Sequence, residues 1–135
     1  MNDILTVKEI MPRDFACRLA ENPDLLILDV REPDEFDFHR IEGSVNVPLR
    51  MLERACERGN AKTVRGLAEA GKSEIVVICR SGYRSYNAAA ILMERGYEHV
   101  VSLKTGLNGW SDFASKSRAG SQTVYGRFGN RALSA

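Results

Sequence analysis

One cysteine is followed closely by two arginines, a combination that could support nucleophilic chemistry on an anionic substrate. Arg80 comes directly after Cys79, and four residues separate Cys79 from Arg84. A thiol beside arginines and at a helix N-terminus loses its proton more easily, so that its pKa falls from about 8.5 to roughly 3.5–7.5. Arginine also binds oxyanions through paired hydrogen bonds. The spacing predicts an activated cysteine nucleophile.

The residues around the arginines suit a backbone cradle. Ser81, Gly82 and Tyr83 lie between the arginines, and Ser85 follows them. Glycine lets the backbone bend so that successive N–H groups point inward, where they stabilise negative charge. A cysteine at the end of an apolar run is by default a packing residue. The loop arginines have no obvious packing role, and they favour the catalytic interpretation.

The segments on either side of Cys79 predict how the thiol is presented. Residues 75–78 form an unbroken apolar, largely β-branched run, which is typical of a strand buried on both faces of a parallel sheet. Residues 86–95 have a helix-like pattern. A cysteine at the carboxyl end of such a strand lies where open α/β sheets bind ligands, and the helix N-terminus that follows attracts anions.

The rest of the chain alternates between strand-like and helix-like segments. Pro12 suits the first turn of a helix, and Asn22-Pro23 ends it. Gly96 is expected just after the helix that follows Cys79. This alternation predicts a parallel five-stranded sheet with helices on both faces. Further strands are expected at residues 5–10, 25–30, 45–47 and 99–103, and further helices at 12–21, from 33, and at 107–113.

Two segments fit this pattern less closely. Residues 49–55 and 62–68 have helical spacing that is broken around Gly59-Asn60, and the role of the whole stretch from Leu49 to Ser73 stays open. From residue 114 onward the composition turns to serine, glycine, arginine and small residues. We expect one domain over residues 1–114 and a tail over 115–135 that is loosely attached or docked on a partner.

The composition is that of an ordinary soluble globular domain. The chain of 135 residues is long enough to bury a core without metal or disulfide support. Its 19 basic and 18 acidic residues are mixed along the sequence, which gives no support for binding nucleic acid or a membrane. The sequence shows neither a signal-peptide pattern nor an apolar run that could span a bilayer, and a cytoplasmic location is expected.

The other cysteines and the histidines have weaker contexts. The three cysteines are odd in number and have no zinc-ligand spacing, so neither a disulfide framework nor a metal site is expected. Cys17 is expected in a helix, on or beside its packed face, and Cys56 in a partly exposed polar stretch. His99 is expected at the surface, at the start of a strand. No cofactor is implied.

Three motifs, in order along the chain, resemble those of the rhodanese family of sulfurtransferases. Cys-Arg-Ser-Gly-Tyr-Arg-Ser at 79–85, after a Val/Ile strand, is similar to the family's active-site loop. Residues 28–36, Leu-Asp-Val-Arg-Glu-Pro-Asp-Glu-Phe, and the following 41–48 resemble its first signature. Residues 103–110 resemble its Gly…Trp closing segment. The resemblance covers about residues 10–113 and implies a rhodanese-like three-layer α/β fold.

The resemblance implies a chemistry. In this family the active-site cysteine takes a sulfane sulfur as a persulfide and passes it to an acceptor. Carried onto this sequence, Cys79 is the nucleophile, and the backbone N–H groups of residues 80–85 hold the bound sulfur. Arg80 is expected to clamp a sulfonate or sulfite group. The family pattern has Gly-His before the isoleucine where this chain has His39-Arg40, so no family role is carried onto His39.

Residues of the first signature are expected to support the loop. Arg84 is expected to close the loop and to brace it through an ion pair with Asp29 or Glu35. For Arg31 two interpretations stand: it reaches the same mouth, or it forms a surface ion pair with Glu32 or Glu35, and the ion pair is slightly favoured.

Three classes of function fit a Cys…Arg loop: a sulfurtransferase, a cysteine phosphatase or arsenate reductase, and a non-catalytic rhodanese-like module. Cysteine phosphatases have five residues between the cysteine and the arginine, whereas Cys79 and Arg84 have four between them. The complete loop argues against a non-catalytic module. The sequence therefore predicts a sulfurtransferase with thiosulfate:cyanide-type activity. Its expected partners are thiosulfate or a low-molecular-weight persulfide and a sulfur-carrier protein, with oligomeric state left open.

Overall fold

A parallel sheet forms the centre of the computed structural model, which describes residues 6–57, 65–120 and 133–134. Its five strands run in the order β1-β6-β5-β2-β4, and every neighbouring pair is parallel. This is the sheet that the alternating sequence pattern predicts, and the fold prediction is confirmed. The strands are β1 (Lys8–Ile10), β2 (Leu26–Asp29), β4 (Val45–Asn46), β5 (Glu74–Ile78) and β6 (His99–Leu103).

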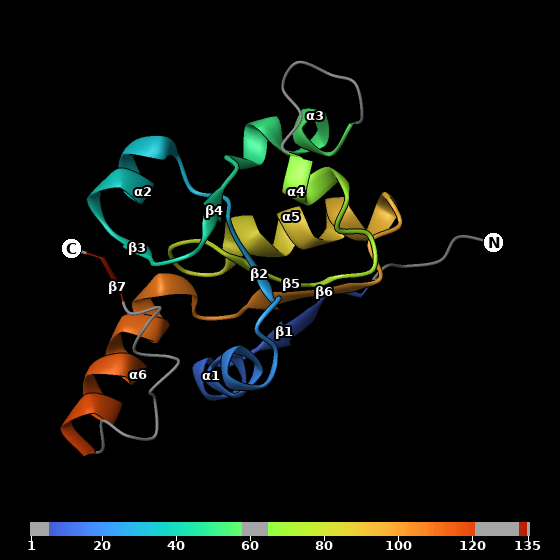
Figure 1. The fold of residues 1–135 in the computed structure, drawn as a ribbon. Coiled ribbons are helices and arrows are strands. Elements are labelled where there is room, and N and C mark those ends of the chain that lie inside the picture. Colours follow the sequence, from blue (N-terminus) through green and yellow to red (C-terminus); the bar gives the residue numbers. More distant parts are fainter. Residues whose placement is uncertain (1–5, 58–64, 121–132, 135) are drawn as a thin grey trace.

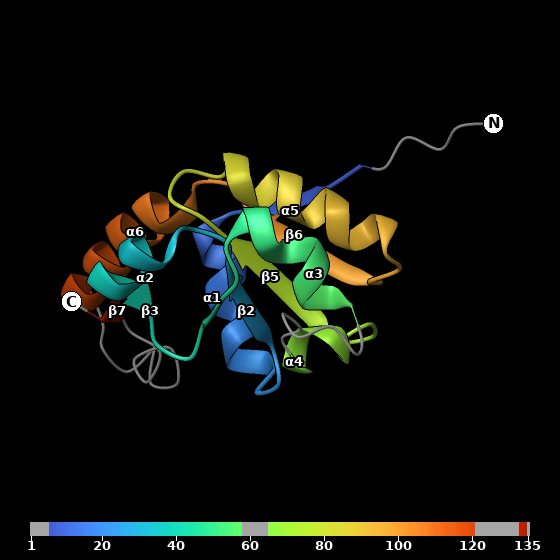
Figure 2. The same cartoon turned by 90° about the horizontal axis from the view of Figure 1, so that it is seen from above.

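Helices cover both faces of the sheet, which gives three layers. Figure 1 shows α1 (Pro12–Glu21) and α6 (Gly106–Gly120) on one side, with α3 (Leu52–Cys56), α4 (Arg65–Ala68) and α5 (Tyr83–Glu94) on the other. Figure 2 shows the same sheet from above, with α2 (Pro33–Phe38) toward one end. A parallel sheet is stable in this form because neither face is left to water.

The central strand β5 explains why there are two cores. Successive side chains of a strand point to opposite faces, so alternate residues enter different clusters. Ile75 and Val77 pack with Leu92 of α5 on one face. Val76 and Ile78 pack on the other face, in the cluster that includes Phe15 of α1 and Trp110 of α6. All four strand residues are fully buried, which is why the segment reads as a continuous apolar run.

The expected starts and ends of the helices are partly confirmed. Helix α1 has the predicted bounds, and Gly96 follows α5 with a φ of 92° and an N–H that donates to the Met93 carbonyl. Helix α5 begins at Tyr83, three residues earlier than the predicted start at residue 86. Gly82 turns the chain with a φ of 109°, and its carbonyl accepts the Tyr86 N–H. The predicted loop is therefore shorter, and it runs directly into the helix.

The last helix also differs from its expected length. Helix α6 extends to Gly120, beyond the predicted end at residue 113, because no proline or glycine interrupts residues 110–119. Strand β7 (Leu133–Ser134) pairs antiparallel with β3 (Arg40–Ile41). Residues 121–132 and 135 lie outside the described part of the chain, and the loosely attached tail stays a prediction.

The two minor cysteines are placed opposite to expectation. Cys17 is exposed, because Phe15 and Leu19 define the buried face of α1 and Cys17 lies across the helix from them. Cys56 is buried, because it shares a helix face with Leu52. The segment from residue 49 contains a 3-10 helix (Leu49–Met51) and then α3 and α4, both of which contribute to the core. The predicted break around Gly59-Asn60 and residues 62–64 of the predicted helical segment 62–68 lie outside the described ranges.

Two findings concern the described residues alone. None of their helices has the length and apolar character needed to cross a membrane. They also contain no cluster of three or more histidine, cysteine, aspartate or glutamate residues that could hold a metal ion.

Candidate active site

Cys79 follows directly after the carboxyl end of β5, the central strand of the sheet. Its residue surface is 1% exposed. The strands on either side end nearby, because the sheet is parallel and β2 and β6 pair with β5 in register. Side chains from several elements can therefore converge on the loop after Cys79.

Two polar groups that follow Cys79 in the chain contact its sulfur. The Gly82 N–H donates to Sγ at 3.0 Å, and Oγ of Ser85 lies 3.4 Å from Sγ. Burial of the thiol opposes its ionisation, but hydrogen bonds from the Ser85 hydroxyl and from the N–H groups of Ser85, Gly82 and Ser81 outweigh it. The net effect is a pKa of Cys79 below its usual value. The loop thus favours the thiolate.

Glycine is required at position 82 for two reasons. Its φ of 109° lies in the left-handed region, which residues with a side chain rarely adopt. A Cβ atom at this position would lie 2.0 Å from the carbonyl oxygen of Lys104. The segment after β6 therefore presses against the loop and fixes its shape.

The start of α6 holds the loop from another side. The N–H of Leu107 donates to the Cys79 carbonyl at 2.8 Å, and the N–H of Asn108 donates to the Arg80 carbonyl at 3.1 Å. Gly106 makes this approach possible, because a Cβ atom there would lie 2.5 Å from the Arg80 carbonyl carbon. Sequence reasoning identified this segment as a motif, but it did not assign it to the loop. The one feature of the sequence that pointed to this contact was Gly106, which follows a polar turn.

Arg84 braces the loop against α2. Its guanidinium group donates to both carboxylate oxygens of Glu35, at 2.6 and 3.1 Å. The hydrogen bonds from Arg84 lower the pKa of Glu35 to about 2. Glu35 is one of the two partners that the sequence offered for Arg84, and the structure contains this pair.

Arg31 has a different partner from the one favoured by the sequence. Its guanidinium group binds both carboxylate oxygens of Asp29, with Nε 3.0 Å from Oδ1 and Nη2 2.8 Å from Oδ2. Both residues are buried, so the predicted surface ion pair with Glu32 or Glu35 is wrong. The local geometry explains the pairing of Arg31 with Asp29. Asp29 is the last residue of β2, and the chain turns there so that the Asp29 carboxylate faces Arg31, two positions later. Glu32 instead pairs with Arg50.

Two further polar residues support the site, and sequence reasoning missed both. The amide of Asn46 donates to the carbonyls of Asp29 and Arg31, at 3.0 and 2.9 Å, which fixes the end of β2. Oγ of Ser102 lies 2.7 Å from Oγ of Ser85 and is fully buried. Ser102 had a sequence signal, because it is the one polar residue between Val100 and Leu103.

Two cavities adjoin the Cys79 loop. The first, of about 260 Å³, is lined by Arg80 together with Arg31, Glu35, Phe38, His39, Leu107, Asn108 and Ser111. The second, of about 430 Å³, is lined by Ser81, Gly82 and Tyr83 together with Glu9, Tyr86, Asn87 and Lys104. Arg80 is exposed, and no ion pair with another described residue occupies it. It differs in this from Arg31 and Arg84, whose charges are already matched by carboxylates.

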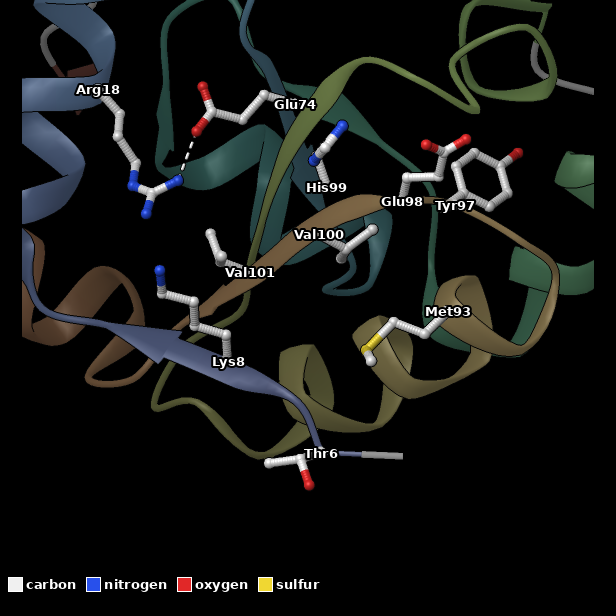
Figure 3. A pocket seen from close by; sticks show the side chains of 10 residues that line it. All are labelled: Thr6, Lys8, Arg18, Glu74, Met93, Tyr97, Glu98, His99, Val100 and Val101. Atoms are coloured by element: carbon white, nitrogen blue, oxygen red, sulfur yellow. Dashed lines mark hydrogen bonds and ion pairs between the residues drawn. The ribbon is translucent and has the colours of Figure 1, made fainter. Parts of the chain in front are cut away.

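A cavity of about 630 Å³, larger than the two beside the Cys79 loop, lies away from this loop. Figure 3 shows Lys8, Glu74 and His99 around it, which come from the first residues of β1, β5 and β6. Since the strands are parallel, these starts lie at the edge of the sheet opposite to Cys79. An ion pair between Arg18 and Glu74 crosses one side of this cavity. Its size is no guide to the chemistry, because no residue of the Cys79 loop lines it.

Comparison with known proteins gives consistent results. The model of the family described as rhodanese-like domain matches residues 12–113. A sulfurtransferase of Allochromatium vinosum is 33% identical over 106 residues, which cover 78% of this chain and 89% of that protein. A putative mitochondrial thiosulfate sulfurtransferase of Schizosaccharomyces pombe is 37% identical over 115 residues, covering 78% and 81%. A solved structure from Rhodopseudomonas palustris, described as a possible tyrosine phosphatase, superposes with a TM-score of 0.72 at 22% identity, covering 84% and 96%.

Proposed function

Because the chain belongs to the family of rhodanese-like domains, we propose that it is a sulfurtransferase that carries sulfur as a persulfide on Cys79. The sulfurtransferase relatives support sulfur transfer in general. The observation that carries the specific proposal is the pair of polar groups at Sγ: the Gly82 N–H donates to it at 3.0 Å, and the Ser85 hydroxyl, which accepts from the thiol, lies 3.4 Å away and can donate to the thiolate. These groups lower the pKa of Cys79 and so supply the thiolate, which is the reactive form of the thiol.

The proposed reaction has two displacements. The Cys79 thiolate attacks the outer sulfur of thiosulfate, a new S–S bond forms, and the old S–S bond breaks with its electron pair leaving as sulfite. An acceptor then attacks the outer sulfur of the persulfide, and the Cys79 thiolate is regenerated. With cyanide as acceptor the product is thiocyanate. The cycle moves no proton, so it needs no general base, and the inward N–H groups stabilise the anionic sulfur throughout.

Arg80 is the proposed contact for the anionic part of the donor. Among the arginines that line the cavity of about 260 Å³, Arg31 is already paired with Asp29, whereas Arg80 has no carboxylate partner among the described residues. The amide of Asn108 and the hydroxyl of Ser111 add polar groups to the same wall. A sulfonate or sulfite group suits this set, because a guanidinium binds two oxygens at once. Thiosulfate or a low-molecular-weight persulfide is the proposed donor.

A sulfur-carrier protein is a further proposed partner. Tyr83 and Tyr86 are exposed large residues beside the loop, and both line the cavity of about 430 Å³. Exposed tyrosines are common at the centre of protein interfaces, because they bury a large area at a small cost in side-chain entropy. A carrier docked here would bring its reacting group to the mouth of the loop.

A phosphatase is the competing function. Its support is the R. palustris structure described as a possible tyrosine phosphatase, but a likeness at 22% identity shows the fold alone. Gly82 donates to Sγ and Tyr83 already begins α5, so the four residues between Cys79 and Arg84 leave a small cradle. A small cradle suits one sulfur atom better than a phosphate. Hydrolysis of aryl phosphates at rates above those of sulfur transfer would favour the phosphatase.

Intact-mass measurement tests the proposal. Thiosulfate should add the mass of one sulfur atom to the protein, and cyanide should remove it as thiocyanate. Cys79→Ser should abolish this gain, whereas Cys17→Ser, which changes an exposed cysteine, and Cys56→Ser, which changes a buried one, should retain it. A sulfur that stays on the Cys79→Ser variant and disappears from either control would refute the assignment.

A further inference from the structure

Ser102 is a buried hydroxyl in an apolar strand. It is fully buried in β6, in register with Val77 of β5, and it lies between Val101 and Leu103. A buried hydroxyl is stable only if its hydrogen-bonding capacity is used. Its recorded partner within the described structure is Oγ of Ser85, at 2.7 Å. Ser85 is in turn the hydroxyl that lies against the sulfur of Cys79.

Counting protons decides which serine donates. Each hydroxyl has one proton and can accept through two lone pairs. Ser102 has no other recorded acceptor in the described residues, so its proton is satisfied only if it points at Ser85. Ser85 then accepts from Ser102, and its own proton is available for a different partner. Two acceptors lie within reach of it: the Gly82 carbonyl at 3.1 Å and Sγ of Cys79 at 3.4 Å.

These two acceptors suit different states of the cysteine. When Cys79 is a thiol, its S–H donates to Ser85, and Ser85 donates to the Gly82 carbonyl. When the sulfur is an anion it can only accept, and the Ser85 proton turns toward it. The Gly82 carbonyl keeps a partner in that case, because it also accepts the Tyr86 N–H at 3.2 Å. The rotation therefore leaves no buried group unsatisfied.

We propose that Ser102 is a positioning residue, which holds Ser85 as an acceptor on one side so that the Ser85 proton serves the anionic sulfur of Cys79. The Ser85 hydroxyl would stabilise the thiolate before sulfur transfer and the persulfide anion after it. The persulfide part rests on the proposed function, whereas the thiolate part can be measured on the resting protein.

The charged groups near the loop are the same in every serine variant, so they do not account for a difference in the midpoint of Cys79 alkylation between variants. They come from each element that packs against the loop, and no recorded hydrogen bond joins one of their side chains to Ser102. These groups are Arg80 in the loop, Arg84 of α5, Glu35 of α2 and His39 after it, Asp29 and Arg31 at the end of β2, Glu9 of β1, and Lys104 after β6.

The test is the pH profile of Cys79 alkylation by iodoacetamide, read by peptide mass mapping in a Cys17→Ser background that removes the exposed thiol. Ser85→Ala should raise the midpoint by about one to two pH units, as expected for loss of a hydrogen bond to a charged group. Ser102→Ala should raise it by roughly half a unit, since the donor remains but is no longer held. Ser44→Ala is the control, because that hydroxyl donates to the Ile41 carbonyl and has no recorded contact with Sγ.

A matched pair separates hydroxyl from packing. Ser102→Thr keeps the hydroxyl and should keep the wild-type midpoint, whereas Ser102→Val has the same shape without the hydroxyl and should behave like Ser102→Ala. Thermal unfolding of each variant reports whether the core tolerates the larger side chains, and Ser102→Ala adds no volume. Equal midpoints for wild type and Ser102→Ala, or equal shifts for the Thr and Val variants, would overturn the proposal. If the shifts appear but thiosulfate adds no sulfur to Cys79, the sulfurtransferase proposal fails and the role of Ser102 in stabilising the thiolate stands.

Discussion

Both carboxylate oxygens of Glu35 accept hydrogen bonds from the guanidinium group of Arg84, at 2.6 and 3.1 Å. This contact joins the first turn of α5 to α2, two elements that lie 49 residues apart at these positions. It also occupies the second loop arginine, whereas Arg80 stays open to the cavity that it lines. The two arginines of the loop therefore have different tasks, and their substitutions should have different consequences.

We expect Arg80→Ala to affect kinetics and Arg84→Ala to affect both kinetics and stability. Loss of a charge-assisted contact costs about 1.5–3 kcal/mol, which corresponds to about one to two decades in kcat/KM. For Arg80→Ala this should be seen mainly as a higher KM for anionic donors, with an unchanged melting temperature. For Arg84→Ala the melting temperature should fall as well. Equal kinetic losses without any change in melting temperature would contradict the division of tasks.

The Glu35 carboxylate should make stability depend on pH. Its hydrogen bonds from Arg84 hold its pKa at about 2 in the folded protein, against 4.5 for an unperturbed glutamate. The folded state then binds fewer protons than the unfolded state, so the contribution is full above about pH 4.5 and is lost as pH falls toward 2. Because both side chains are partly exposed, we expect about 1–2 kcal/mol.

Urea unfolding of wild type and Glu35→Gln at pH 6 and at about pH 2.5 measures this contribution. The difference in free energy of unfolding should be present at pH 6 and mostly absent at the lower pH. Glu42→Gln is the control, because Glu42 is exposed and has no recorded ion pair within the described residues. A difference that is independent of pH would show that the ion pair is not its source.

Alanine substitutions at four glycines should change stability by graded amounts, with the largest losses at Gly82 in the Cys79 loop and Gly106 beside it. Gly82→Ala and Gly106→Ala should each destabilise by more than about 1–3 kcal/mol, because they combine a left-handed φ with a backbone clash at 2.0 and 2.5 Å. Gly96→Ala should lose about 1 kcal/mol, since its φ of 92° is strained but the space is open. Gly66→Ala should be neutral or slightly stabilising, because it lies in α4 with nothing within 4 Å. Chemical unfolding ranks the four, and any other order would refute the clash argument.

The buried pair of Asp29 and Arg31 should matter far more than the exposed pair of Glu32 and Arg50. Removing one member of a buried ion pair leaves an uncompensated charge and costs about 3–5 kcal/mol, whereas exposed pairs contribute about 0–1 kcal/mol. Arg31→Met should therefore destabilise strongly, and Arg50→Met, whose side chain is 62% exposed, should change little. The free energy of unfolding in urea measures both, and similar values for the two variants would contradict this reading of Arg31.

The sequence predicted the features that depend on neighbouring residues. The bounds of α1 follow from Pro12 and from Asn22-Pro23, and the burial of β5 on both faces follows from its continuous apolar run. The motif at residues 79–85 lies at the carboxyl end of the central strand, as the apolar run before Cys79 predicted. These predictions needed only periodicity, proline geometry and composition.

The features of the site that the sequence did not predict depend on which way side chains point after distant elements have packed. Arg31 has five carboxylates within six positions along the sequence, and its pairing with Asp29 follows from the turn at the end of β2. Ser102 could be singled out as a polar residue in an apolar strand, but its contact with Ser85 depends on how α5 lies against β6. The roles of Gly106 and Leu107 required knowing that α6 starts beside the Cys79 loop.

The contacts of Leu107 and Asn108 with the loop have a consequence for the order of events during synthesis. The ribosome makes Cys79 before the segment that shapes its surroundings, since residues 102–108 supply the Ser102 hydroxyl, the Lys104 carbonyl wall and the α6 amides. A nascent chain that ends before residue 102 should carry Cys79 as an ordinary thiol, and alkylation of stalled chains of increasing length measures where its reactivity changes. The thiol would gain its activated character only when the segment that encloses it has emerged.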